Sequence, residues 1–174
     1  SSDRKDDCLT ELVQKIYKQS QAQADPKKWL DQLDSLFEVS HSNFYEQPLW
    51  LDLLQPQMVE ILENNLLILS TALEKLQIYP DLEKYIEIVA YDKNMTEQML
   101  ESIKSNEFSK ARATALSWKE GSKGWSKAKK GISEEALDWQ KEVKPLRDAA
   151  KDSLNKDLLD RYFIFPLDEQ LSMA

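Results

Sequence analysis

The amino-acid sequence predicts an all-α fold, a single irregular helical bundle of about six to eight helices. Glycine and proline are scarce, with three and six among 174 residues, and Leu, Ala, Glu, Lys and Gln outnumber the β-branched residues. This composition favours helices over a sheet with tight turns. Apolar residues also recur at helical spacing through most of the chain. A chain of this length has the size of one domain with its own hydrophobic core.

The first two helices are predicted from apolar spacing and from helix-start signals. Residues 8–21 carry apolar side chains at helical spacing, and acidic residues precede them. Asp25 followed by Pro26 is typical of an N-cap with proline in the first turn, and it predicts a second helix over residues 25–39. The polar stretch 40–47 is expected to be a connection.

The strongest periodic signal in the chain begins at Pro56. Six apolar side chains at intervals of three or four predict one face of a central helix: Met58, Leu62, Leu66, Leu69, Leu73 and Leu76. Residues 79–81 contain a proline and end this helix, and a short helix over residues 82–89 is expected next. Asn94 with Glu97 three residues later is typical of a capping box, so another helix is predicted to begin there.

The second half of the chain predicts further helices. The next one carries its apolar face on Phe108, Ala111, Ala115 and Trp118. Gly121 and Gly124 then interrupt the helical pattern. Ser133 is expected to cap the following helix, which has two glutamates in its first turn. Pro145 is expected to break or restart that helix, and Pro166 to end the last one.

Charge is distributed unevenly along the chain. Residues 29–74 contain eight acidic residues and no Lys or Arg, whereas residues 110–130 contain seven basic residues and one glutamate. The net charge of −8 disfavours nucleic-acid binding by the whole surface, so any contact with a polyanion must be local. We expect one domain over residues 1–174, with a glycine-interrupted basic segment at 119–131.

The sequence offers no convincing catalytic constellation, cofactor motif or metal site. His41 is the single histidine, and the three glycines have neither the P-loop nor the dinucleotide-binding spacing. Glu60-Ile-Leu-Glu63 resembles half of the paired-acid pattern of all-α nucleotide pyrophosphatases, a resemblance that implies Mg²⁺-dependent hydrolysis. The acidic doublet of that family is absent, and Glu83 and Glu87 have a different spacing from its second half. A Mg²⁺-dependent all-α hydrolase is therefore the second alternative.

We interpret the chain as a non-enzymatic protein–protein interaction module of the adaptor, regulator, inhibitor or effector type. Its partner-binding surface is the lysine-free acidic region, represented by Asp31, Asp34, Glu60 and Glu63. The five tryptophans support this hypothesis, because tryptophan is enriched at interface hot spots. The expected partner is another protein, nucleic acid is disfavoured, and the oligomeric state is left open.

The first alternative is a binder of an anionic ligand, a membrane surface or nucleic acid through the basic segment 110–130. If this segment were helical through its glycines, its lysines would line one side with two indoles beside them, an arrangement that suits phosphate-rich partners. The candidate residues are Lys119, Lys123, Lys127, Lys130, Trp118 and Trp125. The structural interpretation of the same segment is a solvated loop whose tryptophans anchor in the core.

The C-terminal aromatic run offers Phe163, Phe165 and Leu167 for docking into another protein, or for packing on the chain's own core. Cys8 is the single cysteine and has no partner for an internal disulfide, which fits a reducing compartment or a protein that is indifferent to redox state. The longest apolar runs are far too short to span a bilayer, so no transmembrane segment is expected. We expect a cytoplasmic location, or delivery into another cell, with peripheral contact to an anionic membrane as one option.

Overall fold

The structure is a computed structural model that describes residues 25, 27–28, 41–125 and 130–163. All regular elements in this part of the chain are helical, which confirms the predicted class. Four α-helices form the body: α3 (Gln55–Leu76), α4 (Glu83–Lys104), α5 (Phe108–Gly121) and α6 (Glu134–Ser153). Four shorter elements are the 3₁₀-helices η1 (His41–Glu46) and η3 (Pro80–Leu82) and the π-helices η2 (Leu49–Leu54) and η4 (Leu154–Phe163). The predicted count of six to eight helices is not confirmed.

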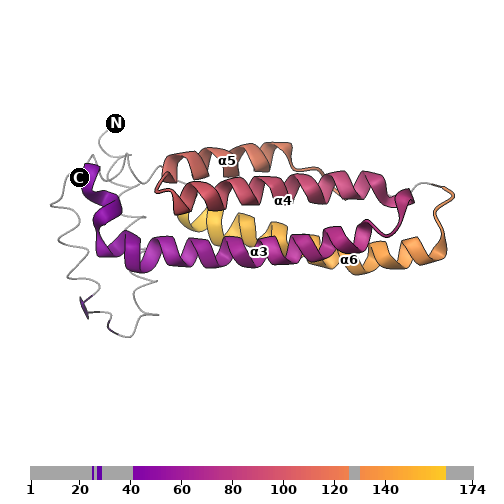
Figure 1. Ribbon diagram of the computed structural model, residues 1–174, viewed down its shortest axis with the longest axis horizontal. Helices are drawn as coiled ribbons and strands as arrows, with labels where there is room; N and C mark the ends of the chain where they lie inside the picture. The colour runs from indigo at the N-terminus through magenta and orange to yellow at the C-terminus, as the bar shows by residue number, and fades with distance from the viewer. Residues whose placement is uncertain (1–24, 26, 29–40, 126–129, 164–174) are drawn as a thin grey trace.

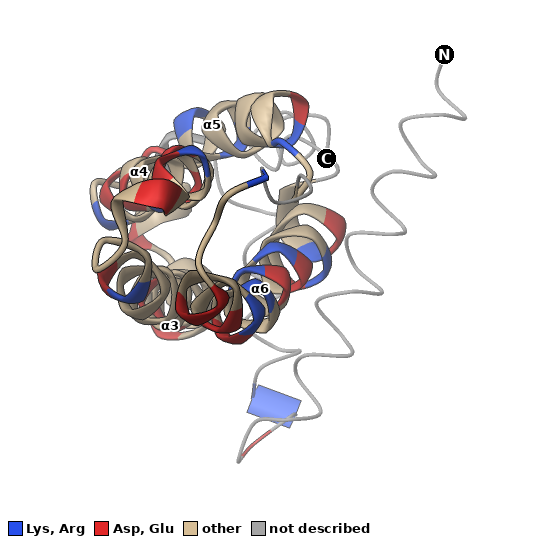
Figure 2. Ribbon diagram, turned by 90° about the vertical axis from the view of Figure 1, so that its right-hand side faces the viewer, with Lys and Arg blue, Asp and Glu red and all other residues tan. Residues whose placement is uncertain are grey.

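The four α-helices run alternately up and down along the long axis of the molecule (Figure 1). α4 lies between α3 and α5, and α3 also packs against α6. η4 continues the direction of α6 and packs against α5 and α3. Viewed along the long axis, the helices enclose a common centre (Figure 2). The short turn at η3 and the longer loop between α5 and α6 lie at the same end of the bundle (Figure 1).

α3 confirms the central helix that the leucine spacing predicts, but its buried face is turned slightly from the predicted one. The fully buried residues are Met58, Leu62, Asn65, Leu69, Ala72 and Leu76. Leu66 and Leu73 are only half-buried, since Asn65 and Ala72 take their places in the core. The Asn65 side chain donates a hydrogen bond there from its Nδ2 to the Oγ of Ser153, 3.1 Å away. A polar partner on another helix is what lets an asparagine occupy this buried position.

α4 is one continuous helix, so the predicted new start at Asn94 is wrong. Two apolar stretches of this helix, one near Tyr85 and one near Met99, lie on the same buried face. Asp92 and Thr96 join them on that face and are also buried. The sequence pattern is interrupted because these two side chains are polar, and their partners in the fold allow them to be buried.

α5 follows the sequence signals closely, and α6 follows them at its start. All four apolar residues predicted for the face of α5 are buried, and α5 ends at Gly121 as expected. The Ser133 Oγ accepts a hydrogen bond of 3.2 Å from the Ala136 N–H, which confirms the predicted cap of α6. Pro145 lies inside α6, so the predicted break there is wrong. The Pro145 side chain faces solvent, and proline lacks the backbone N–H that would donate a hydrogen bond within the helix. Apolar contacts that α6 makes before and after this residue keep the helix continuous.

The core is divided into two apolar clusters along the bundle axis. One combines the first half of α3 with the end of α4, with α5 and with η4, and includes Trp50, Phe108 and Phe163. The other combines the second half of α3 with the start of α4 and with α6, and includes Leu69 and Tyr85. Along α3 and α4, the buried polar residues Asn65, Asp92 and Thr96 lie between these two clusters.

The described parts of the N-terminal region agree in part with the prediction. The Asp25 Oδ1 accepts a hydrogen bond of 3.1 Å from the Lys28 N–H, as expected of an N-cap. The predicted connection at 40–47 contains the 3₁₀-helix η1, which places Phe44 in the core. The other residues of the two predicted N-terminal helices lie outside the described residues. Among the described helices, none has the length and apolar character required to cross a membrane.

Replacing Pro145 with alanine should stabilise the protein. Proline inside a helix is about 3 kcal/mol less favourable than alanine, because it removes a backbone hydrogen bond and crowds the preceding turn. We expect Pro145→Ala to raise the free energy of unfolding by up to about 3 kcal/mol, measured by urea denaturation followed by circular dichroism. Lys144→Ala, at the neighbouring exposed position, is the control and should change it little. A loss of stability in Pro145→Ala would contradict the prediction.

Candidate functional site

The candidate site lies where the chain leaves α5 and passes between α4 and α6. Residues 122–125 are not helical there. The hydroxyl of Tyr91 occupies the space that a Cβ atom at position 121 would need, so Gly121 allows α5 to approach α4 closely. Tyr91 Oη also donates a hydrogen bond of 3.3 Å to the carbonyl of Ser117. These contacts fix the end of α5 against the first half of α4.

A buried polar network beneath this loop joins three helices. The carboxylate of Asp92 accepts two hydrogen bonds of 2.8 Å, one from Trp118 Nε1 and one from Arg147 Nε. The side chains of Asp92 and Arg147 are each 1% exposed. The Thr96 hydroxyl donates to the backbone carbonyl of Asp92 at 2.7 Å. An ion pair removed from water in this way is held by its hydrogen-bond geometry.

Arg147 also ties the loop to the helices. Its second guanidinium nitrogen donates a hydrogen bond of 2.6 Å to the carbonyl of Lys123 and one of 3.4 Å to the hydroxyl of Ser122. One side chain of α6 therefore binds both the α4 carboxylate and the loop backbone. The loop is therefore held at Ser122 and Lys123, within the basic segment.

The two tryptophans of the predicted basic segment are used for packing. Trp118 is 1% exposed and donates its indole N–H to Asp92. Trp125 is half-buried and stacks on Tyr85, with ring centroids 4.9 Å apart, while the Arg147 guanidinium lies 5.7 Å from its ring centroid. This arrangement corresponds to the structural interpretation of the segment, in which the tryptophans anchor a loop. The helical arrangement of lysines beside the indoles is absent at the described positions.

The cations of the basic segment fall into two groups. Lys110 pairs with Glu107 at 3.4 Å, and the Nε of Arg112 donates to the Phe163 carbonyl at 2.8 Å. Lys119, Lys123 and Lys130 are exposed, and none of them has an ion pair with another described residue. Lys127 lies outside the described residues. Within the described part of the segment, these three lysines are therefore the ones whose charges are available to a ligand.

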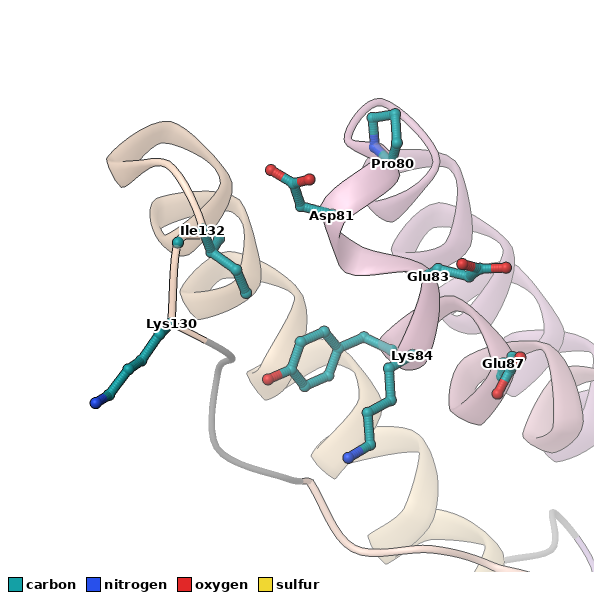
Figure 3. A pocket seen from close by; sticks show the side chains of 9 residues that line it. Pro80, Asp81, Glu83, Lys84, Glu87, Lys130 and Ile132 are labelled. Atoms are coloured by element: carbon teal, nitrogen blue, oxygen red, sulfur yellow. The ribbon is translucent and has the colours of Figure 1, made fainter.

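Two cavities adjoin the loop, and both are lined by Lys84 and Glu87 of α4. The larger cavity, about 630 Å³, is also lined by Lys130, which lies in the loop just before α6. The smaller, about 320 Å³, receives Lys123 from the loop. Figure 3 shows Lys84 and Lys130 extending in a similar direction from two sides of the larger cavity, while the Glu83 carboxylate points away from both. Sequence analysis missed Lys84, because nothing local indicates that it meets a loop about forty residues later.

The predicted acidic surface is only partly described. Glu60 and Glu63 are exposed on α3, and the Glu63 carboxylate lies 3.2 Å from the Lys104 ammonium. Asp31 and Asp34 lie outside the described residues. No group of three or more potential metal-ligating side chains occurs within the described part of the chain. The sequence around Glu63 contains no lysine or arginine, but the fold brings Lys104 of α4 next to it.

The predicted docking tail contributes to the core at its first residue. Phe163 is fully buried and contacts Phe108 edge-to-face, with ring centroids 5.3 Å apart. This contact corresponds to the interpretation in which the tail packs on the chain's own core. Phe165 and Leu167 lie outside the described residues, as does Pro166.

Known proteins similar to this chain include three that are named as subunits of an ATP-dependent helicase/nuclease. The protein of Ligilactobacillus salivarius is 27% identical over 176 aligned positions, which cover 97% of this chain. That of Enterococcus faecalis is 29% identical over 111 positions, covering 64% of the chain. That of Limosilactobacillus reuteri is 30% identical over 110 positions, covering 59% of the chain.

The similarity concerns a small part of each relative. The chain spans 13%, 9% and 7% of the length of these three proteins, in the same order. No family model matches the chain, and no solved structure does. The hypothesis of a non-enzymatic interaction module is wrong, because the relatives are subunits of an ATP-dependent enzyme. The same finding leaves the adaptor, regulator, inhibitor and effector types without support.

Removing one member of the buried ion pair should strongly destabilise the protein. Asp92→Ala leaves the Arg147 charge buried and unpaired and also removes the acceptor of the Trp118 indole. We expect the free energy of unfolding to fall by about 3–5 kcal/mol, measured by chemical denaturation.

An exposed ion pair on the same helix provides the control. Glu97→Ala breaks the contact of Glu97 with Lys93, 3.8 Å long and partly exposed, and should cost less than about 1 kcal/mol. The double variant Asp92→Leu, Arg147→Met should lose less stability than the sum of its single changes, since no unpaired charge remains buried. Equal effects of Asp92→Ala and Glu97→Ala would show that the buried pair does not support the fold.

Proposed function

We propose that this chain is a helical segment of an ATP-dependent helicase/nuclease, and that it contacts nucleic acid through basic side chains around the loop after α5. The proposal rests on the similarity to the Ligilactobacillus salivarius protein described above. That protein is 27% identical to this chain over an alignment that covers 97% of the chain. The chain spans 13% of that protein. We therefore propose that this chain performs one part of the function of a larger enzyme.

The part that we assign to this chain is binding of the nucleic-acid strand, as distinct from binding or hydrolysis of ATP. The three glycines of the chain do not have the spacing of a P-loop, in which backbone N–H groups hold the phosphates of ATP. We assign ATP binding to parts of the longer protein beyond these 174 residues. A helical segment without that motif can still serve a helicase or nuclease by holding the strand on which the enzyme acts.

The exposed lysines support a local contact with nucleic acid. Lys119, Lys123 and Lys130 have no ion pair with other described residues, so their charges are free to meet phosphates. Lys and Arg alternate with Asp and Glu over the helices (Figure 2), and the chain as a whole is acidic. This surface would repel a polyanion at most places, which would restrict a bound strand to the lysines near the loop.

The packing of the tryptophans favours contacts to phosphates over contacts to bases. Trp118 is buried, and one face of Trp125 is covered by Tyr85. Stacking on unpaired bases requires an open aromatic face. Lysine contacts to the phosphate backbone carry no sequence information, so binding should be independent of sequence and sensitive to salt.

The test is binding of the purified chain to fluorescently labelled single-stranded and duplex DNA, and to single-stranded RNA, over a series of salt concentrations. We expect a measurable affinity that falls as salt rises. The triple variant Lys119→Glu, Lys123→Glu, Lys130→Glu should abolish binding. In variants that change only one or two of these lysines, the slope of log affinity against log salt should decrease in magnitude by about 0.7 to 0.9 for each phosphate that is no longer neutralised.

A charge-matched variant at the other end of the bundle separates a local site from a general effect of charge. Lys104→Glu, Lys156→Glu, Arg161→Glu changes the net charge by the same amount, and all three side chains are exposed. This variant should retain most of the binding. Equal losses of affinity in the two triple variants would refute a local site, and absence of binding to all three nucleic acids would refute the proposed function.

A further inference from the structure

We infer that Lys84 and Lys123 together form a phosphate-binding site in the smaller cavity beside the loop, and that Glu87 limits its affinity. The inference rests on the proposed function, because it takes the phosphate to be a phosphodiester of a nucleic-acid strand. The inference goes beyond the proposed function by naming the cavity in which a phosphate binds. It also names Lys84 of α4, which sequence analysis did not select, and the carboxylate of Glu87, whose removal should strengthen binding.

The walls of this cavity come from two separate parts of the chain. Lys84, Glu87, Ile88 and Tyr91 follow one another at the spacing of a single helix face on α4. The opposite wall is formed by the end of α5 and the loop, with Gly121 and Lys123. The cavity volume of about 320 Å³ is ample for a phosphodiester group and several waters, at roughly 30 Å³ for each water.

The site is held in place by buried contacts on its far side. The Lys123 backbone is fixed because its carbonyl accepts a 2.6 Å hydrogen bond from Arg147. Tyr91 is fixed against α5 through the Ser117 carbonyl and the close approach of Gly121. A ligand that meets lysines on a held backbone loses less binding free energy to ordering of the chain than one that meets a free loop.

The charges in the cavity match a phosphodiester. Lys84 and Lys123 are both exposed and have no ion pair among the residues that the structure describes, and Glu87 is the one acidic residue of the lining. Two positive groups and one negative group leave one positive charge, which equals the single negative charge of a phosphodiester. Glu87 repels the same ligand, so the site binds more weakly than its two lysines alone would allow.

Single substitutions test the site, with binding of the chain to labelled single-stranded DNA as the readout. Lys84→Ala should weaken binding several-fold and reduce the salt slope by about 0.7, the effect of leaving one phosphate without its counter-charge. Glu87→Gln should tighten binding by about two- to five-fold, as expected for one exposed charge interaction. The control Lys104→Ala removes an exposed lysine of the same helix that is paired with Glu63, and should have no effect.

The outcomes separate this inference from the proposed function. If Lys84→Ala behaves like Lys104→Ala while the variant at 119, 123 and 130 loses binding, the cavity is not the site and the proposed function stands. If that triple variant also keeps full binding, the proposed function fails as well. Weaker binding of Glu87→Gln overturns the assigned role of the carboxylate.

A second arm identifies the source of the phosphate. The same variants are titrated with ATP in the absence of DNA. Binding of ATP that is lost in Lys84→Ala, with DNA binding unchanged, would overturn the assignment to a strand in favour of a nucleotide. Loss of DNA binding in Lys84→Ala without detectable ATP binding supports the inference.

Discussion

The buried ion pair of Asp92 and Arg147 is the interaction on which the rest of this structure depends. It connects α4 to α6, receives the indole of Trp118 from α5, and holds the loop backbone through the Lys123 carbonyl. Charges buried to 1% exposure are tolerated only with their partners in place, because desolvation of an unpaired charge costs several kcal/mol. Any rearrangement of these helices would leave at least one of these groups without a partner.

The same constraint explains why polar residues interrupt the core between two apolar clusters. Leucines can pack in several registers, whereas a hydrogen bond of 2.8 Å is made in one. Asp92 on α4 with its partners Trp118 and Arg147, and Asn65 with its partner Ser153, therefore specify which parts of the helices lie side by side. The apolar clusters supply most of the stabilisation, and the polar groups fix the alignment in which it is obtained.

The candidate site is a consequence of this alignment. Lys84 and Lys123 line one cavity because α4 and the loop are both tied to Arg147 through the network. The tryptophans that suggested a stacking surface are the side chains that anchor the loop, which leaves the lysines as its exposed chemistry. The similarity to helicase/nuclease proteins contradicts the interaction-module hypothesis, and it is the basis on which we propose nucleic acid as the ligand of this loop.

The sequence by itself determined the helical class, the bounds of α3 and α5 and the start of α6 at Ser133, because spacing, capping and glycine act over a few residues. Tertiary structure decided the continuity of α4 through Asp92 and of α6 through Pro145. In both cases local preference is outweighed by contacts with distant helices. Tertiary structure also decided the site, since the proximity of Lys84 to the basic loop arises from helix packing and leaves no periodic or local signal in the chain.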